Sequence, residues 1–196
     1  MINKKGLPIQ KICITAGLCL LVVAIALFGW WSISISRSEK QAQSYVDRLQ
    51  ALVARPQDAV PAPRGNNDMP ALSVSGTDFV GIIELPDYNS ALPVGGDWGK
   101  VSKHPCRFDG SVYDGTLQIG ATTQKGQYNF YRERSVGDKV VYTDMEGNRY
   151  TYMITSVRNE KHVDKEALER DEAQLTLFIK NIYSFDYLVV YCNLPN

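Results

Sequence analysis

The chain has 196 residues, a length typical of one domain with additional segments. Lysine and arginine together number 21, as do aspartate and glutamate, so no net charge indicates a nucleic-acid partner or an acidic substrate. The 11 tyrosines and 15 glycines suit a β-rich domain with many turns.

The first predicted element is a membrane-spanning helix at residues 12–35, a range that contains no charged residue. Such a helix would be about 36 Å long, enough to cross a hydrocarbon core of about 30 Å. Three lysines precede it, and Trp30 and Trp31 lie where an interfacial aromatic belt would form. We therefore expect residues 1–11 in the cytoplasm and the remaining domain outside it. A signal peptide cleaved after residues 24–26 is the alternative, although the apolar stretch continues past that point.

Residues 36–73 are predicted to join this anchor to a globular domain. As far as Ala54, apolar residues recur at three- and four-residue spacing, which is typical of an amphipathic helix. That helix could pack on the domain, pair with another copy or lie on the membrane surface. From Arg55 onward, four prolines predict an extended linker, and the globular domain is expected at residues 74–196.

The globular part has a mainly β pattern. Apolar and alternating segments predict six strands, at residues 79–85, 115–121, 139–144, 149–157, 174–179 and 187–194. Short helices are expected at residues 128–134 and 164–172. Strands at short intervals with little helix favour a closed or nearly closed β-barrel over a parallel α/β sheet.

The order of these segments resembles that of the sortases, the cell-surface cysteine transpeptidases of Gram-positive bacteria. The stretches that carry the resemblance are "VGIIELPDYNSALPV" (80–94), "PCRFDGSVYDGTLQIGATT" (105–123), "YNFYRERSVGDKVVYTDMEGNRYTYMITSV" (128–157) and "LTLFIKNIYSFDYLVVYC" (175–192). The resemblance implies a sortase-like closed β-barrel with short helices, behind one N-terminal transmembrane helix.

A sortase uses a cysteine thiolate to attack the carbonyl of a sorting motif, a histidine to transfer protons and an arginine to steady the oxyanion. The resemblance places the histidine, cysteine and arginine positions at Thr122, Lys180 and Tyr187. Threonine cannot shuttle protons near neutral pH, acyl transfer to lysine would give a stable amide, and tyrosine lacks the charge of arginine. All three catalytic groups are therefore absent from their expected positions.

The resemblance consequently predicts a catalytically inactive protein that acts by binding a sorting-signal peptide, a surface protein or an active sortase. A working transpeptidase with non-standard residues, attaching surface proteins to the cell wall or to pilins, is the alternative. A decaying relative with no selected role is a third interpretation.

The remaining cysteines and histidines offer weaker signals. In an exported domain Cys106 and Cys192 could form a disulfide, with two free thiols as the alternative. His104 and Cys106 are two residues apart and could share a face of an extended segment, so a displaced Cys/His pair is also considered. His162 lies in a charged stretch that is predicted to be a solvated loop and helix. No ligand spacing indicates a metal ion, and we expect no cofactor and no nucleic-acid partner.

Overall fold

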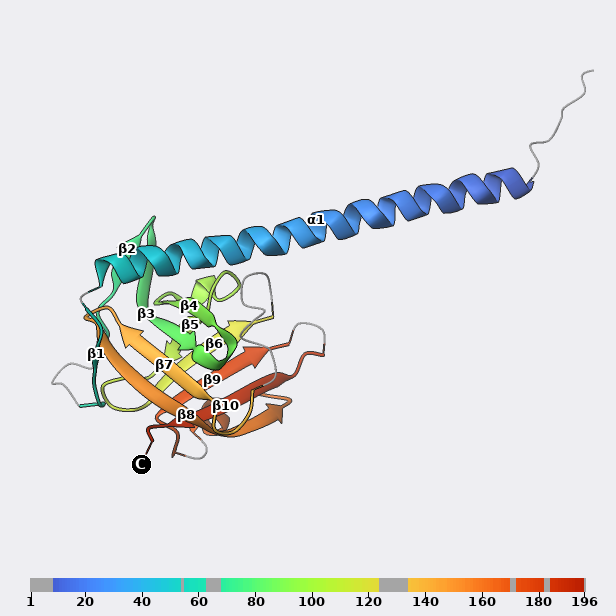
Figure 1. The fold of residues 1–196 in the computed structure, drawn as a ribbon. Helices are drawn as coiled ribbons and strands as arrows, with labels where there is room; N and C mark the ends of the chain where they lie inside the picture. The colour runs from blue at the N-terminus through green and yellow to red at the C-terminus, as the bar shows by residue number, and fades with distance from the viewer. Residues whose placement is uncertain are drawn as a thin grey trace, which may run out of the picture. The chain divides into compact units, whose positions relative to one another are not determined.

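The computed structural model describes residues 9–53, 55–62, 68–123, 134–169, 172–181 and 184–195 (Figure 1). The chain forms two compact units, Met1–Arg37 and Ser38–Asn196. The elements in chain order are α1 (Ile9–Leu52), β1 (Gln57–Asp58), β2 (Leu72–Val74), β3 (Thr77–Leu85), η1 (Pro86–Tyr88), β4 (Ser90–Gly95), η2 (Trp98–Lys100), β5 (Cys106–Asp109), β6 (Leu117–Thr122), β7 (Lys139–Asp144), β8 (Asn148–Glu160), α3 (Lys165–Glu169), β9 (Leu175–Lys180) and β10 (Tyr187–Asn193).

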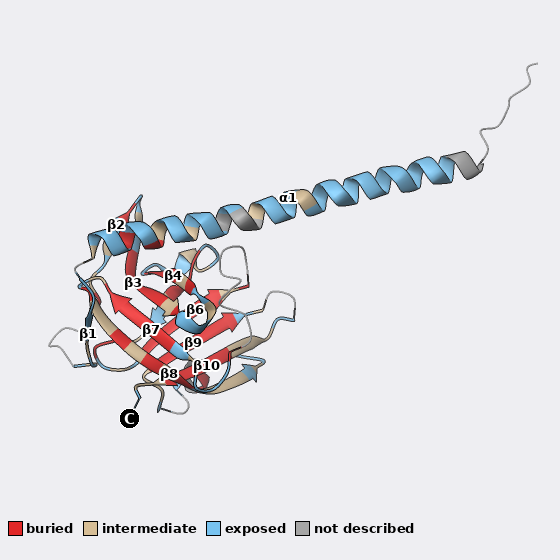
Figure 2. Cartoon of the chain, in the orientation of Figure 1, coloured by how far each residue is buried: buried red, intermediate tan, exposed pale blue. Residues whose placement is uncertain are grey.

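The first unit contains the N-terminal part of α1, which has apolar side chains on every side. Its large apolar residues from Ile12 to Ile33 are exposed in the structure (Figure 2). A helix that is apolar all round needs either a protein core or lipid around it. By length and composition α1 could cross a membrane. The predicted long apolar helix is thus confirmed as a candidate transmembrane span.

The second unit is built around a closed barrel. In the described part of the chain, eight strands follow one another around a ring in the order β3, β4, β5, β6, β9, β10, β8 and β7, and β7 pairs with β3 to close it. Within this ring the pairs are antiparallel except β4–β5 and β6–β9, which are parallel. The predicted mainly β, closed-barrel fold is confirmed.

Alternation along each strand fills the barrel, because successive side chains point to opposite faces. Its core includes Leu117, Ile119 and Ala121 of β6, Leu175, Leu177 and Ile179 of β9, and Tyr142 and Tyr152 of β7 and β8. The Tyr142 hydroxyl donates to the carbonyl of Val80 at 2.7 Å, so its polar end is satisfied inside the barrel. Full burial of a large apolar side chain stabilises the fold by about 1.5–3 kcal/mol, so this interior dominates the stability.

The six predicted strands are all present as β3, β6, β7, β8, β9 and β10. The structure adds β4, which contains Pro93, and β5, which has only four residues and an irregular register. Proline and short length both weaken the sequence signal of a strand. The helix expected at 164–172 is present as α3, whereas the one expected at 128–134 lies outside the described residues except Arg134.

The C-terminal part of α1 packs on the barrel, which is one of the three placements left open by the sequence. Val46 and Leu49 are completely buried and form a small core with Phe79 and Ile82 on the outer face of β3. The apolar face predicted for this amphipathic helix therefore packs against the barrel. The compact unit begins at Ser38, well before the domain boundary expected near residue 74.

The proline-bearing stretch after α1 is also attached to the barrel. Its strand β1 pairs with β8, where Gln57 lies opposite Asn148. Further along, Met69 is 7% exposed and belongs to the barrel core. The described parts of this stretch therefore contact the barrel at β1 and at Met69.

Candidate functional site

The three positions singled out by the sequence lie side by side at one end of three neighbouring strands. Thr122, the last residue of β6, is opposite Lys180, the last residue of β9. Lys180 is in turn opposite Tyr187, the first residue of β10. Neighbouring strands are about 4.8 Å apart, so the three backbones form a compact row. The structure thus brings together residues that are up to 65 positions apart in the sequence.

These three side chains belong to the outer face of the barrel. On β9, Leu177 and Ile179 lie in the barrel core, so Phe178 and Lys180 point outward. Lys180 is exposed, and its Nζ is 5.9 Å from the centre of the Tyr187 ring. Its carbonyl accepts a hydrogen bond from the Thr123 amide at 3.2 Å, which ties the ends of β6 and β9 together.

The chemistry available at this row is limited. It offers the hydroxyl of Thr122, the amine of Lys180 and the phenol of Tyr187, and none of these is a thiol or an imidazole. Lys180 is exposed to solvent, whereas nucleophilic lysines are enclosed in apolar pockets or beside another cation. The row therefore lacks both an activated nucleophile and a group that transfers protons near neutral pH.

An aromatic cluster covers the outer face beside this row. Trp98 of η2 lies over Gly120 of β6, so closely that a Cβ on Gly120 would be 2.4 Å from the end of the Trp98 ring. The Trp98 ring centre is 4.8 Å from that of Phe108 and 5.8 Å from that of Phe178. Because Gly120 and Phe178 each precede a member of the row by two residues, the cluster occupies the adjoining surface. An extended peptide could lie on Gly120 only if Trp98 moved.

Sequence reasoning missed this cluster, although one signal was present. A glycine in a strand interior often marks the close approach of another group, and Gly120 lies in the interior of β6 between Ile119 and Ala121. Trp98 is 38% exposed and Phe108 is 45% exposed, so part of the aromatic surface remains open to solvent.

The short helix α3 covers the outer face on the other side of Phe178. Its Leu168 packs with Phe178, Val189 and Tyr191. The hydroxyl of Tyr191 donates to the carbonyl of Ala167 at 2.5 Å, which fixes α3 to β10. The outer face of β9 and β10 is therefore filled by the chain's own side chains up to Lys180.

No protein-family model matches the sequence, and no curated protein matches it. Among solved structures, sortase A from Corynebacterium diphtheriae is similar with a TM-score of 0.51 at 15% identity, over 83% of this chain and 84% of that chain. A sortase D5 transpeptidase from Clostridium perfringens gives a TM-score of 0.50 at 15% identity, over 61% of this chain and 80% of that chain. The chain has the sortase fold. At this level of identity the likeness concerns the fold alone.

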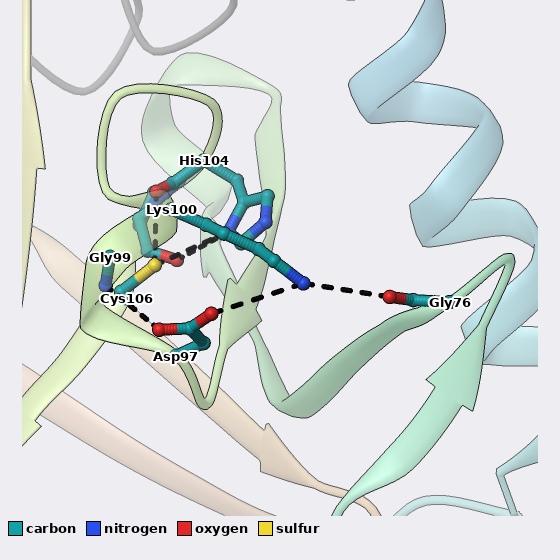
Figure 3. Close-up of polar contacts among 7 residues, drawn as sticks. Gly76, Asp97, Gly99, Lys100, His104 and Cys106 are labelled. Carbon is teal, nitrogen blue, oxygen red and sulfur yellow. Dashed lines mark hydrogen bonds and ion pairs between the residues drawn. The ribbon is translucent and has the colours of Figure 1, made fainter.

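Within this sortase fold, the displaced Cys/His pair considered from the sequence is in contact. Cys106 Sγ lies 3.4 Å from His104 Nδ1 (Figure 3). Burial raises the pKa of the Cys106 thiol to about 12 and lowers the pKa of His104 below its usual range. Cysteine catalysis needs a thiolate that a substrate can reach, but Cys106 is 0% exposed and stays a neutral thiol. The pair is therefore a structural contact.

The disulfide considered for Cys106 and Cys192 is not formed, and this corrects the sequence interpretation. Both residues are free, buried cysteines. Cys106 pairs with Gly120 in β6, whereas Cys192 lies in the barrel core on β10, opposite Leu175. The two cysteines lie on β5 and β10, which are separated by β6 and β9, and they are also at different heights along the strands. The pairing was considered because two cysteines follow the apolar helix, but the register of the barrel keeps those two residues apart.

Metal binding was not expected from the ligand spacing. Within the part of the chain that the structure describes, no group of three or more histidine, cysteine, aspartate or glutamate side chains is arranged to hold a metal ion. His162 is exposed in the connection between β8 and α3, as the charged stretch predicted.

Proposed function

We propose that this protein is a membrane-anchored, extracytoplasmic sortase-like protein that does not catalyse transpeptidation and acts by binding a partner. The observation that supports this most strongly is the row of Thr122, Lys180 and Tyr187. The row has the geometry that the sortase resemblance implies for a catalytic centre, because three adjacent strand ends converge on one outer surface. Its residue types cannot supply a thiolate, a proton shuttle or a cationic oxyanion contact.

The proposed location follows from the N-terminal part of α1. Residues 12–35 are uncharged, and the lysines on their N-terminal side favour a cytoplasmic N-terminus. A single pass would then hold the barrel outside the cell membrane, in the compartment where sortases meet their substrates.

The aromatic cluster supports a folded partner rather than an extended peptide. Trp98 covers Gly120, so the strand surface itself is not available to a peptide backbone. Trp98 and Phe108 nevertheless keep 38% and 45% of their surface exposed, next to Lys180. Aromatic residues are enriched among the residues that carry binding energy at protein interfaces. Of the partners considered, a surface protein or an active sortase fits this surface better than a sorting-signal peptide.

A binding experiment tests the proposal. Full-length protein in detergent micelles is titrated with an active sortase, with a sortase-anchored surface protein and with sorting-signal peptides, and each peptide is recovered for mass analysis. We expect one of the proteins to bind, the affinity to fall at least about tenfold in Trp98→Ala, and every peptide to be recovered intact. Val60→Ala is the matched control, since Val60 is 71% exposed on the stretch after α1. Absence of binding to all three would refute a binding role, and processed peptide would support a working transpeptidase.

A further inference from the structure

His104 occupies a closely fitted site on the outer face of the barrel, beside η2 (Figure 3). The side chain is only 6% exposed. Gly95 of β4 leaves room for its ring, because a Cβ there would be 2.3 Å from His104 Cε1. The other side of the ring faces Phe79, with the two ring centres 5.2 Å apart.

The hydrogen bonds of His104 suit a neutral ring. Its Nδ1 donates to the Pro105 carbonyl at 3.2 Å, and the Cys106 thiol donates to the His104 carbonyl at 3.4 Å. Nε2 is buried and has no hydrogen-bond partner among the described residues. A second proton would sit on Nε2, where it would be a buried donor without an acceptor, and such groups are costly.

The charges around His104 also disfavour a protonated ring. Lys100 and Lys103 both oppose a positive charge there, and burial has the largest effect in lowering the pKa of His104. The Asp97 carboxylate raises the pKa of His104. It also accepts a hydrogen bond from the Gly99 amide at 2.9 Å and lies 3.9 Å from Lys100 Nζ, so other groups share its charge. The strands packed on the ring contribute the uncharged Phe79, Gly95 and Cys106.

The docked part of α1 rests on the same aromatic contact. Phe79 lies between His104 and Tyr45 of α1, with ring centres 5.2 Å and 5.1 Å away. Phe79 also belongs to the small core that contains Val46 and Leu49. Arg48 on this helix donates to the hydroxyl of Ser75, which places a further cation near the contact. Asp47 and Asp78, next to Val46 and Phe79 in the sequence, are both exposed. Phe79 is therefore in contact with both the His104 ring and the docked helix.

We propose that His104 is an acid-sensitive latch, whose protonation releases residues 38–52 of α1 from the barrel. Above a pH of about 6.5 the ring is neutral whether the helix is docked or released, and docking is at full strength. In this proposal, release of the helix uncovers Phe79 and opens the His104 ring to water, so only the docked state keeps the lowered pKa. As the pH falls below about 6.5, the released state then takes up the proton first. The equilibrium constant for docking of the helix then falls by up to about tenfold for each pH unit, until the pH reaches the lowered pKa of His104 in the docked state.

Hydrogen exchange of the full-length protein in nanodiscs, at pH 7.5 and pH 5.5 with times corrected for intrinsic exchange, tests this latch. The chain has two histidines, so His162→Asn is a matched control for His104→Asn, which keeps a donor near Pro105. We expect residues 38–52 to lose up to about tenfold protection at pH 5.5 in the wild type and in His162→Asn, while β9 stays protected. The response should be absent in His104→Asn.

Three results would overturn the latch. One is a wild-type helix whose protection does not change with pH, and another is an equal response in His104→Asn. The third is an equal loss of protection in β9, which would indicate acid unfolding of the whole barrel. Should His104→Asn not fold, His104→Gln provides the same comparison, since it also cannot take up a proton.

Discussion

Replacing Gly120 with alanine should displace Trp98 from the surface beside Lys180. The new Cβ would lie 2.4 Å and 2.6 Å from two carbons at the end of the Trp98 ring, and 2.7 Å from the tip of Phe178. Separations below 3.0 Å force one partner to move. Trp98 is the partner that can move, because it lies on a short 3-10 segment and is 38% exposed.

The loss of unfolding free energy in Gly120→Ala can be worked out from the contacts that Trp98 would lose. Its ring makes two aromatic contacts, with Phe108 and Phe178, and such pairs contribute about 0.5–1.5 kcal/mol each beyond their buried area. Gly120→Ala should therefore destabilise the barrel by about 1–3 kcal/mol, the range typical of overpacking. In a Trp98→Ala background the ring is gone and Phe178 can move into its space, so the same substitution should cost less than about 0.5 kcal/mol.

Urea unfolding of the full-length protein in micelles, followed by far-UV circular dichroism, measures the four members of this double-mutant cycle. We expect a coupling free energy of about 1–2 kcal/mol between the two positions. Gly96→Ala is the matched control, because its Cβ would meet Val80 Cγ1 at 3.2 Å and the Asp78 carbonyl oxygen at 3.8 Å, and Trp98 is not among its nearest neighbours. If the two changes in unfolding free energy add, with a coupling within about 0.3 kcal/mol of zero, then Trp98 does not cover Gly120. That result would refute the claim that side chains of the chain itself fill this surface.

Three further predictions concern the anchor, the thiols and the barrel interior. The full-length protein should remain in the membrane after carbonate washing, and protease outside intact cells should remove the domain beyond Arg55; release of a mature protein that starts near Leu27 would contradict the anchor. After unfolding without reductant, a variant lacking the two cysteines of the apolar helix should titrate two thiols, whereas none would indicate a disulfide. Gly81→Ala should lower the unfolding free energy by at least about 2 kcal/mol, since its Cβ would lie 2.2 Å from the Tyr142 hydroxyl; unchanged urea unfolding would contradict that packing.

Local patterns were enough to predict most of the barrel from the sequence. Apolar runs such as "TLFIK" and "YLVVYC" mark strands that are buried on at least one face, and a turn at Gly147 separates β7 from β8. The row of Thr122, Lys180 and Tyr187 was located by the sortase resemblance, which assigns the three catalytic positions to the ends or the start of such runs. β4 and β5 were missed since Pro93 and a short, irregular register remove the alternating pattern on which the prediction depends.

Features that depend on distant partners could not be predicted in this way. The amphipathic helix showed an apolar face, but only the fold reveals that Phe79 lies beneath Val46 and Leu49. The approach of Trp98 to Gly120 brings η2 onto β6, and no local spacing encodes it. The disulfide interpretation failed for the same reason, because it counted cysteines without the register that separates them.

An assay of peptide turnover tests most directly the central claim that this sortase-like protein does not catalyse transpeptidation. Full-length, unmodified protein in micelles is incubated with a library of sorting-motif peptides and an amine acceptor, and products are detected by mass spectrometry. The account predicts no cleavage and no transpeptidation by the wild type, by Lys180→Ala or by Cys106→Ala. Repeated turnover that Lys180→Ala abolishes would contradict the account by making Lys180 catalytic, and turnover that only Cys106→Ala abolishes would contradict it by assigning the chemistry to the pair of Cys106 and His104.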